Sequence, residues 1–327
     1  MTSAKRALII GVSGQDGSYL ARSLCDAGYD VHGTSRDREM AGLQNLRAVG
    51  VVDRVTLHSL VLTDFRSVLN VLAAVAPDEI YNLAAQSSVD LSFETPVETF
   101  DSIVVGTLNV LESMRFLKSS ARFYNAASSE SFGDTHGRPA TEDTPFSPRS
   151  PYGVAKAGAY WVVRNYREAY GLFACSGILF NHESPLRPAR FVTQKVVRAA
   201  VDISMGRTEG LRLGNLDIAR DWGWAPEYVV AVRRMLGRDE PDDFVIATGA
   251  AVKLETFVSR AFERLDLDWR QHVVTDAALR RPLDLTYSVG DPSKAAELLG
   301  WTAQVRMPEL VDRLVDAERD RRASGSN

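Results

Sequence analysis

The feature that most constrains this chain is a glycine-rich turn close to its start. Residues 7–10 form a short apolar run, which is typical of a buried parallel strand. Gly11, Gly14 and Gly17 follow at intervals of three, and residues 19–27 have the pattern of a helix. Such a turn lets the backbone approach a pyrophosphate, which then lies at a helix N-terminus where N–H groups favour anions. The sequence therefore predicts a dinucleotide-binding unit at the start of the chain.

The alternation of strands and helices predicts the fold class. Apolar strand runs that alternate with helical patterns occur at 29–33, 55–60, 79–83, 121–126 and 172–180. This alternation predicts a Rossmann-type α/β fold with a doubly wound parallel sheet. Beyond Pro185 and Pro188 the alternation ceases, so we expect a smaller C-terminal α/β domain that binds the substrate.

The expected domain boundaries follow from this change of pattern. The dinucleotide-binding domain is expected to cover residues 1–180, with 224–240 returning to it. The substrate-binding domain is expected to cover 181–223 and 241–320. Residues 321–327, rich in Arg, Ser and Gly, are expected to be a disordered tail.

Composition and charge exclude several classes of function. The chain of 327 residues has a net charge of −4 with both signs interspersed, which argues against nucleic-acid binding. The apolar run near the N-terminus is too short for a signal sequence or a membrane span. Cys25 and Cys175 lie in apolar contexts without metal-ligand spacing, so we interpret them as buried free thiols of a cytoplasmic protein. We therefore expect no metal, no nucleic acid and no membrane partner.

A second group of residues predicts oxidation of an alcohol. Tyr152 and Lys156 lie at i and i+4 on one face of a predicted helix, roughly 5–6 Å apart at Cβ. An ammonium beside a phenol favours the phenolate, so we expect a lowered pKa for Tyr152. The strand at 121–126 delivers Ser128 and Glu130 just past its carboxyl end, where ligands bind in open parallel sheets. The competing interpretation is structural, with an exposed helix pair and a carboxylate that caps the next segment.

Further residues are expected to contact a nicotinamide dinucleotide. Gln15 and Asp16 lie within the glycine-rich turn. Leu83 and Ala84 end the fourth predicted strand, where small residues leave room for a cofactor. Arg36 follows the second strand, at the position that reads the ribose 2′ group. An arginine there favours NADP, while the acidic residue next to it keeps NAD open.

Longer motifs connect the chain to a known family. They are GQDGSYL at 14–20, SPRSPY at 147–152, NYREAY at 165–170, GILFNHESP at 177–185, GNLD at 214–217, RDWG at 220–223 and FVIATG at 244–249. With the glycine-rich turn and the Tyr152/Lys156 pair, the chain resembles the extended short-chain dehydrogenase/reductase superfamily. Within it, the chain resembles the GDP-mannose 4,6-dehydratase family over nearly its whole length.

The resemblance implies a dehydratase that converts GDP-mannose to GDP-4-keto-6-deoxymannose by internal hydride transfer through bound NADP. Tyr152, with Lys156, is then the base at the sugar C4 hydroxyl, and Ser128 holds the same oxygen. Glu130 removes the C5 proton and helps the C6 hydroxyl leave, and the hydride taken from C4 returns to C6. The residues that the resemblance places around the substrate are Ser87, Asn181, Lys195, Arg220, Arg281 and Asp284.

Other functions stay open at this stage. A GDP-heptose 4,6-dehydratase or C4 dehydrogenase would carry almost the same motifs. A sugar-nucleotide C4 epimerase or reductase needs no base at C5, so Glu130 argues against it. The intact Tyr152/Lys156 pair argues against a non-catalytic regulator that only binds the cofactor. His182 is interpreted as a structural residue beside the site in preference to a catalytic one.

The chain also departs from the family pattern. Ser128 stands where the family has Thr, which keeps the hydroxyl but constrains χ1 less. Asp284 stands where relatives have Glu near the ribose, and it has a shorter reach. The loop after Arg36 is shorter and less basic than in relatives, where it helps to build a tetramer. Both a homodimer and a homotetramer are therefore open.

Overall fold

A computed structural model describes residues 4–279 and 283–324, and within them a parallel sheet organises the first half of the chain. The seven strands described in this sheet are, in spatial order, β10 (Phe244–Ile246), β6 (Ala174–Leu179), β5 (Arg122–Ser128), β4 (Glu79–Asn82), β1 (Arg6–Ile10), β2 (Asp30–Ser35) and β3 (Val55–Ser59). All neighbouring pairs are parallel. The strand order reverses direction at β1, which lies between β2 and β4. The predicted doubly wound, Rossmann-type fold is confirmed.

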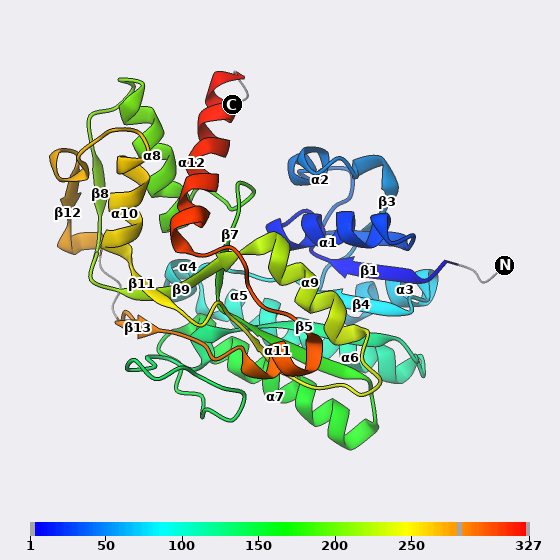
Figure 1. The fold of residues 1–327 in the computed structure, drawn as a ribbon. Helices are drawn as coiled ribbons and strands as arrows, with labels where there is room; N and C mark the ends of the chain where they lie inside the picture. Colours follow the sequence, from blue (N-terminus) through cyan, green and yellow to red (C-terminus); the bar gives the residue numbers. More distant parts are fainter. Residues whose placement is uncertain (1–3, 280–282, 325–327) are drawn as a thin grey trace.

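Helices cover both faces of this sheet (Figure 1). One face carries α1 (Gln15–Asp26) and α9 (Ala225–Leu236), which pack against each other. The other face carries α3 (Phe65–Val75), α6 (Gly106–Phe116) and α7 (Pro151–Tyr170). Because both faces are covered, the strands are buried on both sides, which explains why they read as continuous apolar runs.

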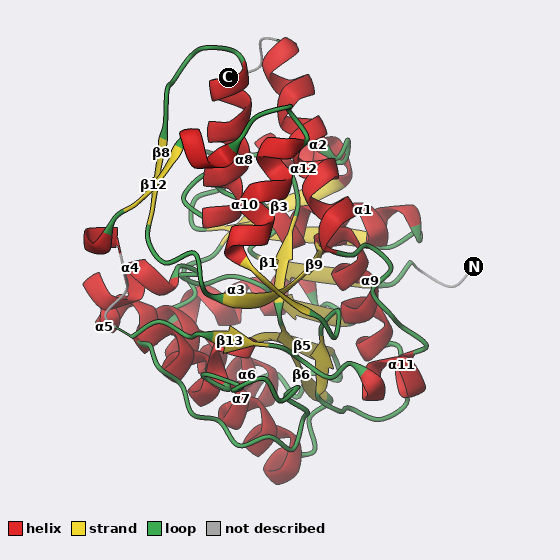
Figure 2. Ribbon diagram, turned by 60° about the vertical axis from the view of Figure 1, so that its left-hand side comes forward, coloured by secondary structure: helices red, strands yellow, loops and turns green. Residues whose placement is uncertain are grey.

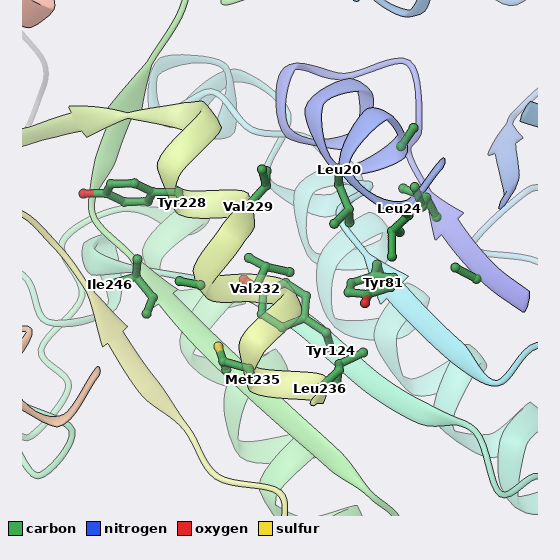
Figure 3. Close-up of a cluster of buried hydrophobic side chains, with 14 of the residues drawn as sticks. Leu20, Leu24, Tyr81, Tyr124, Tyr228, Val229, Val232, Met235, Leu236 and Ile246 are labelled. Atoms are coloured by element: carbon green, nitrogen blue, oxygen red, sulfur yellow. The ribbon is translucent and has the colours of Figure 1, made fainter. Parts of the chain in front are cut away.

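Helix α9 comes from the second half of the chain but completes the core of the first. Figure 3 shows Leu20 and Leu24 of α1 near Val232 and Leu236 of α9, with Tyr124 of β5 in the same cluster. The apolar residues of α9 recur at helical spacing and form one stripe. Burying each such side chain contributes about 1.5–3 kcal/mol, so this cluster ties α9 firmly to the sheet.

The remaining elements build a second region with its own core. Its helices α8 (Val192–Ser204), α10 (Leu254–Glu263) and α12 (Met307–Ala323) pack on one another, as Figure 2 shows. Its strands are β7 (Asn181–Glu183), β8 (Leu211–Leu213), β9 (Ala219–Trp224), β11 (Ala251–Lys253), β12 (Val273–Thr275) and β13 (Tyr287–Ser288). Strand β9 is central here, because it pairs with β7, β11 and β13.

Some expected boundaries are wrong. Strand β10 falls within the range 241–320, yet it pairs with β6 at the edge of the large sheet. Residues 321–323 were expected to belong to a disordered tail, but they are part of α12, which continues to Ala323. The guanidinium of Arg321 lies 2.6 Å from Glu318 in this last turn, which stabilises the helix there.

Shorter helices complete the first half and the sheet edge. Helix α5 (Pro96–Phe100) continues through a π-helical turn (Asp101–Val105) into α6. Helices α2 (Gln44–Ala48) and α4 (Val89–Glu94) escape prediction from the sequence, because each is short. Helix α11 (Ser293–Leu299) lies against β10.

Candidate active site

The glycine-rich turn joins β1 directly to α1, which begins at Gln15 and not at the predicted residue 19. Gly11 has a φ of 91°, and a Cβ on Gly17 would lie 2.3 Å from the Gly11 carbonyl oxygen. Neither position accommodates a side chain. Among the described residues no side chain caps α1 at Gly14, so its first N–H groups are available to a ligand. This backbone cradle fits the pyrophosphate of a dinucleotide.

Asp16 and His182 join this turn to β7. The His182 Nδ1–H donates to the Phe180 carbonyl oxygen at 2.7 Å, and Nε2 lies 2.8 Å from an Asp16 carboxylate oxygen. Burial alone would raise the pKa of Asp16, but the charge and hydrogen bond of His182 outweigh it and lower this pKa to about 2. Burial alone would lower the pKa of His182, but Asp16 raises it above its usual value. Both ring nitrogens are thus engaged, which supports the structural interpretation of His182.

The side chain of Gln15 strengthens the same junction. It donates to Asp16 Oδ1 at 2.9 Å and to the His182 carbonyl oxygen at 3.2 Å. Its own amide oxygen accepts from the Ser184 hydroxyl at 2.8 Å. The buried amide of Gln15 thus holds the glycine-rich turn against β7, while its backbone N–H lies at the start of α1.

The predicted catalytic residues all line a cavity of about 350 Å³ between the two regions. Ser128 is the last residue of β5, and Glu130 lies in the 3-10 turn that follows it. Tyr152 and Lys156 come from the first two turns of α7. The neighbouring ends of two elements therefore bring together a hydroxyl, a carboxylate, a phenol and an amine.

A glycine lets α7 come close to the end of β5. Ser150 caps α7, because its side chain accepts from the Gly153 N–H at 3.0 Å. A Cβ on Gly153 would lie 2.7 Å from the Glu130 carbonyl oxygen. The absence of a side chain at the residue after Tyr152 thus sets how closely Tyr152 approaches the turn that carries Glu130.

Burial dominates the electrostatics of Tyr152 and Lys156. It raises the pKa of Tyr152 to about 12, with the hydrogen bond from Ser128 acting against it and the Glu130 charge adding to it. It also lowers the pKa of Lys156 to about 8. Lys156 Nζ donates to the Ala126 carbonyl oxygen at 2.7 Å and lies 5.7 Å from the centre of the Tyr152 ring. The predicted lowering of the Tyr152 pKa is therefore wrong for the protein alone, because desolvation of the phenolate prevails.

The predicted substrate residues lie along the same cavity. Ser87 precedes α4, Asn181 belongs to β7, Lys195 to α8 and Arg220 to β9, and all four line it together with Asp284. The Arg220 guanidinium is buried, and its Nη2 donates to Asp284 at 3.1 Å. Residues from distant parts of the chain thus converge on one cavity.

Only some of the predicted cofactor residues line this cavity. Asp16 and Leu83 line the cavity. Arg36 is exposed past the end of β2, and the Gly11 backbone packs against Ala84. Within the described residues the cavity lining does not include Gly11, Gly14, Gln15, Gly17, Arg36 or Ala84. Arg281, predicted to bind substrate, lies outside the described residues.

Arg187 and Arg190 also line the cavity, although the sequence analysis does not single them out. The Arg187 guanidinium lies 3.8 Å from the centre of the Phe191 ring, and its Nε is 3.5 Å from Glu183. Arg190 lies 5.3 Å from the same ring, and its Nη2 donates to the Ser87 hydroxyl at 3.4 Å. A usable signal was present, because both arginines follow the carboxyl end of a buried strand, where ligands bind.

Comparison with known proteins decides the family. A family model described as GDP-mannose 4,6 dehydratase matches residues 8–314. The chain belongs to the GDP-mannose 4,6-dehydratase family. It is 45% identical over 324 residues to GDP-mannose 4,6 dehydratase 2 of Arabidopsis thaliana, a match that covers 96% of this chain and 87% of the relative. It is 44% identical to the GDP-mannose 4,6-dehydratase of Sinorhizobium fredii, with 96% and 97% covered.

A solved structure agrees with this assignment at the level of the fold. UDP-glucose 4-epimerase of Thermus thermophilus, in complex with NAD, has a TM-score of 0.84 and 25% identity to this chain. The likeness covers 96% of this chain and 99% of the epimerase. The family resemblance that the sequence motifs predict is therefore confirmed.

Proposed function

We propose that this protein is a GDP-mannose 4,6-dehydratase, which converts GDP-mannose to GDP-4-keto-6-deoxymannose and water. Beyond family membership, the observation that carries the proposal is the position of Glu130. It follows Ser128 at the end of β5 and lines the same cavity as Tyr152 and Lys156. Oxidation or epimerisation at C4 needs no base at C5, whereas elimination of water does.

Each catalytic residue has a distinct part in the proposed reaction. Bound NADP supplies a site that takes up the hydride and returns it, so the cofactor is unchanged at the end. The protein alone favours the neutral phenol of Tyr152, but the positive charges of Lys156 and of the oxidised nicotinamide would favour the phenolate. As the phenolate, Tyr152 accepts the proton of the C4 hydroxyl, while Ser128 hydrogen-bonds the same oxygen. Glu130 removes the C5 proton, which the C4 ketone acidifies, and delivers a proton to the departing C6 hydroxyl. Lys156, oriented by the Ala126 carbonyl, supplies positive charge beside Tyr152.

The proposal names NADP in preference to NAD. Arg36 lies exposed after β2, where a guanidinium pairs with a ribose 2′-phosphate. The acidic neighbour that keeps NAD open, Asp37, turns toward its own loop, because its carboxylate accepts from the Glu39 N–H at 2.9 Å. Identifying the nucleotide that is released when the purified protein is denatured tests this choice, and release of NAD alone would contradict it.

The nucleoside diphosphate is proposed to lie against Asn181, Lys195, Arg220 and Asp284. Arg220 supports this placement most strongly, because a buried fork of N–H donors matches two phosphate oxygens. Lys195 is exposed and adds a point charge. Arg281 is included on the family resemblance alone.

Incubation with GDP-mannose tests the proposed function. The expected product has lost the mass of one water molecule, with no net change in nicotinamide absorbance. Net formation of NADPH would indicate a C4 dehydrogenase, and an isomer of unchanged mass would indicate an epimerase. Turnover of a GDP-heptose but not of GDP-mannose would indicate the heptose-specific relative.

We also propose that the enzyme forms a homodimer through α5, the following π-helical turn and α7. Large apolar side chains are exposed on these helices: Val97, Phe100, Val105, Val154 and Trp161. Trp161 is 54% exposed and lies seven residues from Val154, so the two share one face of α7. An exposed apolar face of this kind marks an interaction surface.

Light scattering after size-exclusion chromatography tests the dimer. Trp161→Glu combined with Val97→Asp is expected to give a monomer, because both charges would be buried in the interface. Val274→Asp, at an equally exposed valine of β12, is the control and is expected to leave the dimer intact. An unmodified enzyme that elutes as a tetramer would show that a second interface exists.

The proposed location is the cytoplasm, because Cys25 and Cys175 are both free thiols. None of the helices within residues 4–279 and 283–324 combines the length and the apolar character that a membrane span requires.

A further inference from the structure

We propose that Arg190, together with Ser87, is a specificity residue that binds hydroxyl groups of the substrate's sugar. The inference rests on the proposed function, because it concerns the glycosyl part of a sugar nucleotide bound in the same cavity. These side chains come from different regions of the molecule and are in contact.

The contact between Arg190 and Ser87 joins the two regions of the molecule at the cavity. Arg190 Nη2 donates to the Ser87 hydroxyl oxygen at 3.4 Å, over a sequence separation of 103 residues. Ser87 follows β4 in the first region, and Arg190 precedes α8 in the second. Both residues are exposed and both line the cavity, so a ligand that enters meets them.

The contact lies on the catalytic side of the cavity. Strand β4, which leads to Ser87, pairs in parallel with β5, which ends at Ser128. The residues past the carboxyl ends of these neighbouring strands are therefore close to one another. Arg187, in the same segment as Arg190, lowers the pKa of Tyr152, although burial is the larger effect and raises it. The segment that carries Arg190 thus lies near the atoms that react.

Packing holds the Arg190 guanidinium in place while leaving its donors toward the cavity. It lies 5.3 Å from the centre of the Phe191 ring, against which Arg187 also packs at 3.8 Å. Next to Ser87, Ser88 is buried, and its hydroxyl caps α4 by accepting from the Leu91 N–H at 3.3 Å. Ser87 is therefore the hydroxyl that this segment presents.

The chemistry of the pair matches neighbouring sugar hydroxyls. A guanidinium has only donors, so its ligand must offer acceptor oxygens. The Ser87 hydroxyl both donates and accepts, and it can bond a hydroxyl whose oxygen already accepts from Arg190. The diphosphate has a separate set of partners in Lys195 and the buried Arg220, which leaves the glycosyl group to Arg190 and Ser87.

Binding measurements separate a sugar contact from a phosphate contact. Calorimetric titrations with GDP-mannose and with GDP are made in a Tyr152→Phe background, so that the substrate persists. Arg190→Met keeps the apolar stem over Phe191 and removes the donors. It is expected to weaken GDP-mannose binding about tenfold and to leave GDP binding unchanged within about twofold. Arg220→Gln is the contrasting variant, and it is expected to weaken binding of both ligands.

A double-mutant cycle tests whether the residues act as a pair. Ser87→Ala alone is expected to weaken GDP-mannose binding by a smaller factor than Arg190→Met. Because the two side chains share the same ligand atoms, their combined effect is expected to be less than the product of the single effects.

Two results would overturn the inference. Equal weakening of GDP and GDP-mannose binding by Arg190→Met would place the guanidinium on the diphosphate, and no weakening of either would make it a solvated charge. Failure of the proposed function has a different signature, in which the unmodified enzyme forms no dehydrated product from GDP-mannose.

Discussion

The two walls of the cavity are built in different ways. The catalytic wall, formed by Ser128, Glu130, Tyr152 and Lys156, lies on β5, the turn after it and α7. The recognition wall carries its charged groups on the segment before α8, on α8 itself and on β9. Reacting atoms must be held within fractions of an ångström, which favours regular elements. Groups that only bind a substrate can lie on connecting segments, where changes of sequence are tolerated and readily alter binding.

The walls also differ in how they handle charge. On the recognition wall, arginines lie beside acids, as in the pairs of Arg187 with Glu183 and Arg220 with Asp284. On the catalytic wall burial sets the protonation of Tyr152 and raises its pKa to about 12, which favours the neutral phenol. Ion pairs thus hold the charged groups of the recognition wall, whereas burial controls protonation on the catalytic wall.

The largest expected effect comes from a change confined to the catalytic wall. Glu130→Gln is expected to slow dehydration by about 10²–10⁴-fold, because it removes the base and acid of the elimination. Oxidation at C4 is expected to continue, so nicotinamide absorbance should rise in a single turnover while no water is lost. Absorbance under stopped flow and product mass measure the two steps.

The control for this prediction is another carboxyl group. Glu142→Gln changes a residue outside the lining of the cavity, whose oxygen accepts from the Val245 N–H at 2.7 Å. The amide oxygen keeps that hydrogen bond, and turnover is expected to persist. Near-normal dehydration by the Glu130→Gln variant would assign the base to another residue and remove the distinction between the walls.

An intermediate effect is expected from the recognition wall. Arg220→Gln is expected to weaken GDP binding by about 10- to 100-fold, because a charge-assisted fork to the diphosphate is lost. The turnover number at saturating substrate is expected to change little, since Arg220 does not touch the reacting carbons. Calorimetry with GDP and steady-state kinetics measure the two quantities.

A surface arginine provides the comparison for that variant. Arg212→Gln, on β8, breaks an exposed pair with Asp276 and is expected to leave GDP binding unchanged. Arg220→Gln could instead lower the turnover number by the same factor as the GDP affinity. Binding and catalysis would then depend on both walls together.

The smallest expected effect concerns the Asp16–His182 pair that joins the walls. The pKa of His182 is raised on folding, so the pair's contribution is fully present below about pH 6.5 and is lost as the pH rises through the folded pKa. The lowered pKa of Asp16, about 2, keeps its carboxylate charged throughout that range. Asp16→Asn is therefore expected to lower the free energy of unfolding by about 2 kcal/mol at pH 6 and by less at pH 9.

Urea unfolding at both pH values measures this difference. Asp53→Asn, at an exposed carboxyl, is expected to change the free energy of unfolding by less than about 0.5 kcal/mol at either pH. A loss for Asp16→Asn that is the same at pH 6 and pH 9 would show that charge on His182 does not contribute.

The sequence predicts the first region better than the second. Strands buried on both faces read as apolar runs, so β1 to β6 and the position of Ser128 and Glu130 after β5 follow from local pattern. Strand β10 has only three residues, as do several strands of the second region. Only its pairing with β6 assigns it to the large sheet. Arg187 and Arg190 follow the carboxyl end of a buried strand, but this position by itself does not separate a ligand contact from a solvated charge.

The sequence by itself determined the family, the order of strands and helices and the identity of the reacting groups, because motifs and apolar periodicity are local. Only the tertiary structure decided which side chains meet. Asp16 reaches His182 over 166 residues, and Arg190 reaches Ser87 over 103. It also decided the pKa of Tyr152, where burial outweighs the hydrogen bond with Ser128. Contact and burial depend on how distant segments pack, and no local stretch of sequence contains that information.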